Sequence, residues 1–235
     1  MTNTILQAVG LTQQYGPTRA LDGVSIAFAE GTATAIMGAS GSGKTTLLHA
    51  LAGIRTPDTG SVHYAGSEIS GLSDADRSRL RRQHFGFVFQ QGLLVPELTA
   101  VENVALALML NGTPRRQAIG PAAQWLAALG LAGLEDRRIG ELSGGQAQRV
   151  AIARAQVTGA RIVFADEPTG ALDSVTSDEV MNALLGSTVG RGQTLVVVTH
   201  DPSVAARCQR VVTVRDGRIV ADQPTQQVSA AGVPQ

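Results

Sequence analysis

A glycine-rich run between two regular segments limits the possible folds of this 235-residue chain more than any other feature. Residues 34–37 predict a buried strand, and residues 47–52 predict a helix. Between them stand Gly38, Ala39, Ser40, Gly41, Ser42, Gly43, Lys44, Thr45 and Thr46, which match G-x-x-x-x-G-K-[ST] in its strand–loop–helix context. Glycines let backbone N–H groups approach phosphate oxygens, and the start of the following helix favours an anion. The run therefore predicts a loop that binds a nucleoside triphosphate, with Lys44 on the β- and γ-phosphates and the Thr45 hydroxyl on Mg²⁺.

The placement of lysine supports this prediction. Of the 19 Lys and Arg residues in the chain, only Lys44 is a lysine. A compact ammonium binds phosphate as a point charge, whereas arginine binds through a planar fork. A Gly- and Ser-rich turn before an ordinary helix is the alternative interpretation, and the lone lysine favours the phosphate loop.

Three other predicted strands end in polar residues. These residues are Gln90 after residues 85–89, Asp166 and Glu167 after residues 161–165, and His200 after residues 194–199. Ligands of open α/β sheets gather beyond the carboxyl ends of the strands, so we expect these side chains to converge with Lys44. Asp166 is placed to hold a Mg²⁺-bound water, and Glu167 is placed to polarise the attacking water as a general base.

A second possible anion site lies at residues 142–146, which read Leu-Ser-Gly-Gly-Gln before a helix predicted from Ala147 to Val157. Taken alone, Ser143 is an ordinary helix cap. A single chain rarely needs two phosphate-binding elements, so the pair suggests a nucleotide that is shared between two copies of the chain.

Tyr15 lies in a turn at residues 14–17, shortly before the phosphate loop. An exposed aromatic ring there can stack on the adenine base, an interaction that tolerates any base. A packed hairpin residue is the alternative, and the spacing leaves both open.

The remaining patterns predict a single α/β domain. Short strands at residues 5–9, 24–28 and 60–66 predict a small antiparallel sheet. Thr99 and Glu102 form a capping box at the start of one helix. A second helix at residues 122–129 carries Trp125, which is expected to lie in the hydrophobic core. The expected parts are a nucleotide-binding core with the β subdomain at about 1–91 and 157–223, an inserted helical lobe at about 92–156, and a flexible tail at 224–235.

The composition limits the partners. The net charge is zero, so Arg77, Arg79, Arg81 and Arg82 on a helical stretch predict a solvated face and no nucleic-acid partner. No apolar window reaches the ~18 residues that cross a membrane, and residues 1–4 lack a basic run, so we expect a cytoplasmic chain that relies on another chain for membrane spans. The single cysteine, Cys208, cannot form an internal disulfide.

Together these motifs resemble the ATP-binding-cassette ATPases, the motor subunits of ABC transporters, over nearly the whole chain. The run from Leu142 to Gln146 marks that family among phosphate-loop proteins. The resemblance implies a P-loop NTPase core of RecA-like fold with a small antiparallel β subdomain and an inserted α-helical subdomain. It also implies that Tyr15 stacks on adenine, that Gln90 acts in catalysis and on Mg²⁺, and that Asp166 is the second protein ligand of the metal beside Thr45. Glu167 would then be the catalytic glutamate, Asp173 part of a nucleotide-contacting loop, and His200 the switch histidine.

The family's head-to-tail dimer further implies that two identical subunits enclose two ATP molecules. Ser143, Gly144, Gly145 and Gln146 of one subunit would close on the γ-phosphate held by Lys44 of the other, and hydrolysis would open the dimer. A separate permease would dock near Gly92 to Asn103 and hold the chain at the inner face of the cell membrane.

Residues 88–104 and 165–173 resemble one branch of the family, which contains macrolide exporters, lipoprotein-releasing complexes, antimicrobial-peptide resistance transporters and a cell-division ATPase. We therefore expect a subunit that drives a permease, with a cell-division ATPase that transmits force without transport as the alternative. Ala39, Ala147 and Gly170 depart from the branch pattern, and none of them removes a charged group.

Other classes of phosphate-loop protein fit less well. A chromosome-handling ATPase needs a long heptad insertion between Gln90 and Leu142, and this insert is short and broken by proline. A small kinase or GTPase has no use for the second anion site at Ser143. A regulator that binds ATP without turnover is disfavoured by the presence of Glu167 and His200.

Overall fold

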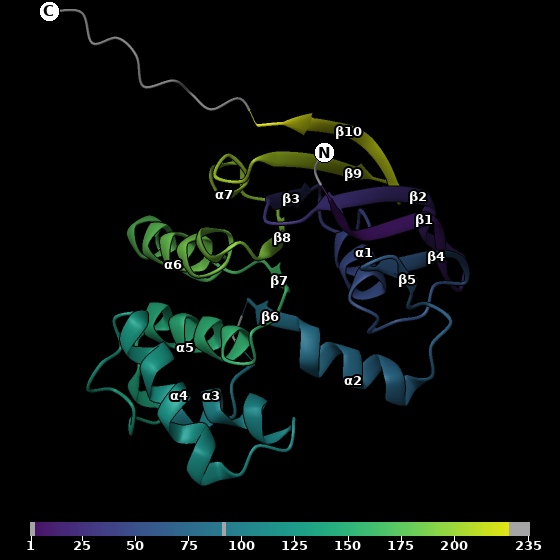
Figure 1. Cartoon of the computed structure of the whole chain (residues 1–235). Coiled ribbons are helices and arrows are strands. Elements are labelled where there is room, and N and C mark those ends of the chain that lie inside the picture. Colours follow the sequence, from purple (N-terminus) through teal and green to yellow (C-terminus); the bar gives the residue numbers. More distant parts are fainter. Residues whose placement is uncertain (1–2, 91–92, 226–235) are drawn as a thin grey trace, which may run out of the picture.

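The chain was analysed as a computed structural model that describes residues 3–90 and 93–225. It combines two β-sheets with helices that gather mostly on one side (Figure 1). Gly92, where the predicted docking stretch begins, lies outside the described residues. Of the predicted tail at 224–235, only Pro224, the last residue of a strand, and Thr225 are described.

A six-stranded sheet forms the centre of the molecule. Its members are β3 (Ala33–Met37), β6 (Phe85–Phe89), β7 (Ile162–Asp166), β8 (Thr194–Thr199), β9 (Arg210–Arg215) and β10 (Arg218–Pro224), in the order β10-β9-β3-β8-β7-β6. All neighbours pair in parallel except β9 and β10. Every residue of β8 is buried, which matches the continuous apolar runs that a sheet covered on both faces requires. The register sets Met37 beside Thr199, and Asp166 beside Phe89 and Val198, so the carboxyl ends of four strands meet at one edge.

A second, antiparallel sheet contains β1 (Thr4–Tyr15), β2 (Thr18–Ala29), β4 (Thr59–Tyr64) and β5 (Ser67–Glu68), in the order β2-β1-β4-β5. Its existence confirms the expected β sheet, but β1 and β2 are much longer than residues 5–9 and 24–28. The pairing shifts between Ala8 and Leu11, where Gly10 has a φ of 60°. This irregularity breaks the alternation of buried and exposed residues, and for that reason the sequence pattern ended the strand too early.

The helices are α1 (Lys44–Leu51), α2 (Asp74–His84), α3 (Ala100–Met109), α4 (Arg115–Ala128), α5 (Gly144–Gln156), α6 (Ser174–Ser187) and α7 (Pro202–Ala205), with short 3-10 turns η1 (Ile139–Glu141) and η2 (Val189–Arg191). Both bonds of the predicted capping box between Thr99 and Glu102 are present. The expectation that α4 starts at residue 122 is wrong, because Pro121 lies inside the helix and the pattern treats proline as a helix boundary. In the described part of the chain, no helix combines the length and the apolar character needed to cross a bilayer.

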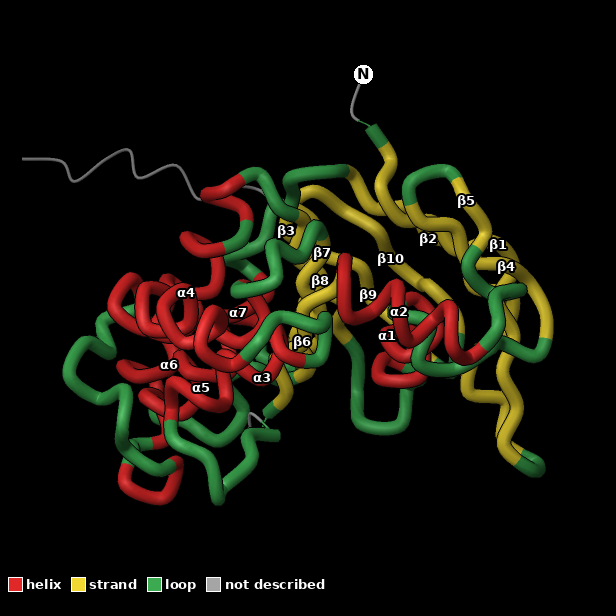
Figure 2. Tube along the Cα trace, turned by 60° about the horizontal axis from the view of Figure 1, so that its bottom comes forward, coloured by secondary structure: helices red, strands yellow, loops and turns green. Residues whose placement is uncertain are grey.

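Three clusters of buried apolar side chains hold these elements together. One joins the antiparallel sheet to α1 and a face of the central sheet, and a second joins the other face to α5, α6 and α7. Cys208 belongs to the second cluster, where burial raises the pKa of its thiol to about 12 and keeps it neutral. The third cluster joins α3, α4 and α5. Together with α6, these helices lie on the side of the molecule away from the antiparallel sheet (Figure 2). Because α5 contributes to two clusters, the division of the chain near residue 156 stays a prediction.

The expectation for Trp125 is wrong in degree. Its ring is only half-buried, at the edge of the third cluster. The guanidinium carbon of Arg191 lies 4.4 Å from the ring centroid, which is a cation–π distance. Trp125 therefore packs between its own helix and η2 and does not lie inside the helical core.

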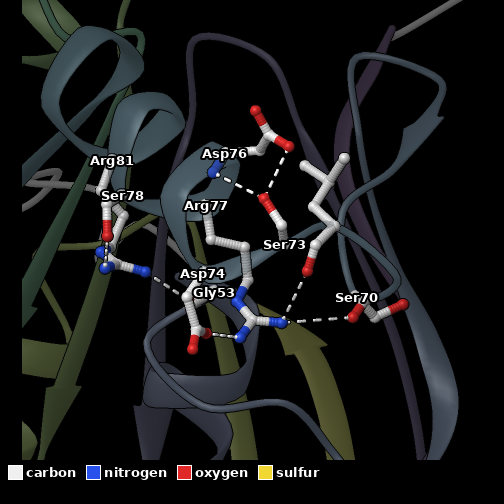
Figure 3. Close-up of polar contacts among 9 residues, drawn as sticks. Gly53, Ser70, Ser73, Asp74, Asp76, Arg77, Ser78 and Arg81 are labelled. Atoms are coloured by element: carbon white, nitrogen blue, oxygen red, sulfur yellow. Dashed lines mark hydrogen bonds and ion pairs between the residues drawn. The ribbon is translucent and has the colours of Figure 1, made fainter.

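The arginines of α2 do not form a uniformly solvated face (Figure 3). Arg77 has a side chain only 12% exposed; it donates to the carbonyl of Leu72 at 3.1 Å and pairs with Asp74. Arg81 donates to the carbonyl of Gly53 and to the Ser78 hydroxyl. These bonds attach α2 to the segments before it, so two of the four arginines serve the fold.

Candidate active site

The phosphate loop between β3 and α1 depends on glycine at two positions. Gly43, which precedes the first residue of α1, has a φ of 104°, and a Cβ there would lie 2.3 Å from the carbonyl oxygen of Ala20. At Gly38 a Cβ would lie 2.2 Å from the carbonyl oxygen of Val214. Both distances are far below van der Waals contact. The glycines therefore let the loop lie directly against the strands beneath it, with its N–H groups at the start of a helix.

Two polar side chains of this loop are buried. Lys44 is 8% exposed, and its Nζ donates to the carbonyl oxygens of Gly38 and Ala39 at 2.8 and 2.9 Å. Ser42 is 7% exposed, and its hydroxyl oxygen has no hydrogen-bond partner within the described chain. Buried polar atoms are normally satisfied, so this unpaired hydroxyl is unusual. The loop holds its single ammonium in place before any phosphate binds.

A cavity of about 660 Å³ opens over the loop. Its lining brings together most of the residues that the sequence predicted: Tyr15, Ala39, Ser40, Gly41, Gly43, Lys44, Thr45, Thr46, Gln90, Asp166, Glu167 and His200, with Ala20 and Val198. Gly38 and Ser42 do not line this cavity. The convergence follows from the aligned carboxyl ends of β3, β6, β7 and β8.

Oxygen donors for a divalent cation meet in this cavity. The Thr45 hydroxyl donates to Asp166 Oδ2 at 3.3 Å, and Gln90 lines the same space. Burial raises the pKa of Asp166 above its ordinary value, while the Thr45 hydroxyl acts in the opposite direction. Hydroxyl, carboxylate and amide oxygens suit Mg²⁺, which binds through few protein groups and keeps waters or phosphates as its other ligands. In residues 3–90 and 93–225, no group of three or more His, Cys, Asp and Glu side chains forms a metal cage.

Glu167 is held by two neighbours at the end of β8. Its Oε1 lies 2.7 Å from His200 Nδ1, and its Oε2 lies 3.2 Å from the Thr199 hydroxyl. An ionised carboxylate only accepts, so in this contact His200 Nδ1 is the donor. Asp166 instead contacts Thr45, so the two adjacent carboxylates have separate partners. Sequence reasoning assigned no role to Thr199, although it stands directly before His200.

Tyr15 is 42% exposed and lines the cavity, so its ring is accessible from the space over the phosphate loop, and the adenine-stacking interpretation stays a prediction. The guanidinium carbon of Arg55 lies 4.7 Å from the ring centroid. A cation there fixes the plane of the ring and adds positive charge next to a site for a polyanion. The sequence carried no signal for this contact, because Arg55 follows α1 and Tyr15 ends β1.

The predicted second anion element lies outside this cavity. Its residues are Ser143, Gly144, Gly145 and Gln146, none of which lines the space over the phosphate loop. Ser143 is exposed and caps α5 with its hydroxyl, which accepts from the Gln146 N–H at 3.2 Å. A Cβ on Gly145 would lie 2.4 Å from Thr176 Cγ2, so glycine permits α5 to pack against the start of α6.

Asp173 is the N-cap of α6 and lies with this second element. Its carboxylate accepts from the Thr176 N–H and hydroxyl at 3.0 and 2.7 Å, and these bonds hold the pKa of Asp173 below its ordinary value. A smaller cavity of about 390 Å³ runs along this loop and shares Glu167 and His200 with the larger one. One chain thus presents two separate elements that suit phosphate.

The single lysine side chain allows a direct test of the cavity. An acylating reagent has Lys44 Nζ and the terminal α-amino group as its only amine targets. We expect ATP at ten times its Kd to slow the modification of Lys44 by about 10-fold, because bound phosphates cover the ammonium. Peptide mass spectrometry measures both sites, and the α-amino group is the internal control. Equal rates at Lys44 with and without ATP would exclude phosphate contact at that residue.

Comparison with known sequences identifies a family and named relatives. Residues 21–170 match the family model described as ABC transporter. The lipoprotein-releasing system ATP-binding protein LolD of Geobacter metallireducens is 45% identical over 94% of this chain and 100% of its own length. The macrolide export protein MacB of Chromobacterium violaceum is 47% identical over 86% of this chain, and the probable syringafactin export protein SyfD of Pseudomonas syringae is 43% identical over 95%. The chain spans 31% and 35% of the lengths of these two export proteins.

Comparison with solved structures gives the same fold. The dimeric structure of MJ0796, a bacterial ABC transporter cassette, matches 94% of this chain and 99% of its own chain, with a TM-score of 0.86 and 36% identity. A dimeric post-hydrolysis state of MJ0796 bound to ADP and Pi matches with a TM-score of 0.85 and 35% identity. These likenesses confirm the predicted α/β cassette fold.

Proposed function

This chain belongs to the ABC transporter family, and we propose that it is the ATP-hydrolysing subunit that drives a separate membrane permease. The observation that carries the proposal is the arrangement of two incomplete nucleotide sites: Lys44, Thr45, Asp166, Glu167 and His200 share one cavity, while Ser143 lies outside it. The relatives named for lipoprotein release and export support a transport role. Since no observation favours the cell-division alternative, we do not propose it.

The two elements fit one site if two protomers meet head to tail. The exposed Ser143 of one protomer would then complete the cavity over Lys44 of the other. The dimeric cassettes among the solved structures support this arrangement, since this chain matches almost their full length. Two ATP molecules in the interface would couple binding to closure, and loss of the γ-phosphate would remove contacts from both protomers.

Within one site, the phosphate loop would bind the β- and γ-phosphates through its backbone N–H groups and Lys44 Nζ. Tyr15, stiffened by Arg55, would stack on the adenine base. Thr45, Asp166 and Gln90 would hold Mg²⁺, which neutralises charge on the phosphate oxygens. Each of these groups already lines the cavity, so binding needs little rearrangement of the chain.

Glu167 would accept a proton from the water that attacks the γ-phosphate. The carboxylate is 19% exposed at the cavity wall, and its Thr199 and His200 contacts fix its orientation. Since His200 donates from Nδ1 to Glu167, its Nε2 is the ring nitrogen left to face the γ-phosphate, and it can donate to a phosphate oxygen only when it also carries a proton. The His200 side chain is 70% exposed and has the freedom to turn toward that phosphate.

For the permease, we propose a docking surface in the groove between α2, β6, α3 and α5, which would place the chain at the inner face of the membrane. This groove measures about 550 Å³, and its apolar walls include Ile54, Phe89 and Leu110. It adjoins the predicted stretch from Gly92 to Asn103, because Arg154 lines it and donates to the Leu93 carbonyl. Asn103 is fully buried and bonds to the loop before α3, so that residue supports the surface and does not form it.

Leu110→Glu tests the docking surface. Leu110 is 60% exposed, so the charge should leave basal ATPase activity within about two-fold while it weakens permease binding by at least about 10-fold. The assay compares ATPase activity with and without the partner permease, in proteoliposomes. Val220→Glu on β10, 51% exposed and outside the groove, is the matched control. Full permease stimulation of Leu110→Glu would place the docking surface elsewhere.

A further inference from the structure

Thr199, the last residue of β8, lies between the start of α7 and the carboxylate of Glu167. The residue is 1% exposed. Its hydroxyl oxygen accepts from the Asp201 N–H at 3.0 Å and lies 3.2 Å from Glu167 Oε2. Asp201 in turn caps α7, with its carboxylate accepting from the Ser203 N–H at 2.7 Å. One buried hydroxyl therefore joins the capped turn before α7 to the proposed general base.

The number of protons fixes the direction of this bond. A threonine hydroxyl has one proton and two acceptor lone pairs. The Asp201 N–H occupies a lone pair, so the proton is available for the Glu167 carboxylate, which only accepts when ionised. The chain of bonds runs from N–H to O–H to carboxylate, and bonds in such a series polarise and strengthen one another. A hydrogen bond that is donated to an ionised carboxylate is among the stronger hydrogen bonds of a protein.

The base needs such a partner because its own segment leaves the side chain mobile. Glu167 has a φ of 47°, an uncommon left-handed value for a residue other than glycine, and its N–H donates to the Val198 carbonyl at 2.9 Å. The backbone is thus tied to β8, but the side chain still has three rotatable bonds. His200, the other partner, is largely exposed and would turn toward substrate. Thr199 is buried and β-branched, so its own rotamer is restricted.

We propose that Thr199 is a positioning residue for ATP hydrolysis, which holds the Glu167 carboxylate in place while His200 turns toward the γ-phosphate. The proposal rests on the proposed role of Glu167 as general base. It assigns Thr199 no contact with ATP. Removal of its hydroxyl should therefore slow the chemical step and leave nucleotide binding unchanged.

The test compares four variants with the wild type in steady-state ATPase assays. Thr199→Val removes the hydroxyl at constant shape, and Thr199→Ser restores it. Thr194→Val is the matched control: Thr194 is at the other end of the same strand, is fully buried, and its hydroxyl also accepts from a backbone N–H, that of Gly31 at 3.0 Å. Glu167→Gln measures how much activity depends on the base itself.

We expect Thr199→Val to lower kcat by about 10–100-fold, because a misplaced catalytic group loses activity on that scale. Its KM and Kd for ATP should stay within about two-fold of the wild-type values, because a group that acts only in the chemical step does not contribute to ground-state binding. Thr199→Ser and Thr194→Val should retain kcat, although Thr194→Val should lose as much thermal stability as Thr199→Val.

Several results would overturn the proposal. A wild-type kcat in Thr199→Val, or an equal loss of kcat in Thr194→Val, would reduce Thr199 to a structural residue. If Thr199→Val does not fold, Thr199→Ala replaces it, and failure of both to fold also assigns Thr199 a structural role alone. If Glu167→Gln keeps full turnover, the assignment of Glu167 as the general base fails. If Glu167→Gln is inactive but Thr199→Val has a normal kcat, only the proposal for Thr199 fails.

Discussion

Glu167→Gln should lower ATP turnover by about 10³-fold, within the range that general-base catalysis contributes, while ATP binding persists. The amide matches the shape of the carboxylate. Its oxygen can accept from Thr199, and its NH₂ can donate to His200 Nδ1 once the imidazole carries its proton on Nε2, so the local structure should survive. The amide cannot take a proton from water. The variant should therefore accumulate in the ATP-bound state, which we expect to be a stable dimer.

Phosphate release and nucleotide retention together measure this effect. Glu68→Gln on β5 is the control, since Glu68 lies in the antiparallel sheet and outside the cavity. The control should hydrolyse ATP at the wild-type rate. If Glu167→Gln turns over ATP as fast as the wild type, Glu167 is not the base and the water must be activated by another group.

Ser143→Asp should lower hydrolysis by at least about 100-fold, because a carboxylate would face the γ-phosphate across the dimer interface and repel it. Aspartate caps helices as well as serine does, so α5 should start at the same residue. ATP binding to the Lys44 side of a single protomer should be unchanged. The loss would thus appear in the shared site and leave the cavity of each chain intact.

Two further variants sharpen this prediction. Ser143→Asn keeps the cap without the charge and should retain more activity than Ser143→Asp. A mixture of Ser143→Asp with Lys44→Ala should recover activity that neither variant has alone, because their mixed dimer contains one site with both Lys44 and Ser143 intact. Wild-type hydrolysis by Ser143→Asp, or no recovery in the mixture, would argue against shared sites.

The sequence predicted the parts of the site that depend on local pattern. The phosphate loop has a fixed spacing, and β6, β7 and β8 are short apolar runs that end in polar residues, so their convergence follows from parallel-sheet geometry. The helix start at Thr99 was equally readable, since capping is a relation between residues three apart, whereas α5 begins at Gly144 and not at the predicted Ala147. These features need no knowledge of distant contacts.

Contacts between distant segments could not be predicted in this way. Arg55 meets Tyr15, and Arg191 meets Trp125, only because the fold brings their elements together. Thr199 reads as the last residue of a buried strand, and its bond to Glu167 depends on the register of β7 against β8. The predicted boundaries of β1 and α4 were wrong at Gly10 and Pro121, because each residue is a local disruption that the surrounding structure accommodates.

The most direct test of the account is the molar mass of Glu167→Gln in solution, measured by light scattering with and without Mg²⁺ and ATP. The proposed shared sites predict a monomer without nucleotide and a dimer with ATP, and Lys44→Ala in the same background should abolish the dimer. A Glu167→Gln protein that binds ATP but keeps the mass of one chain at high concentration, and with the permease supplied, would contradict the account.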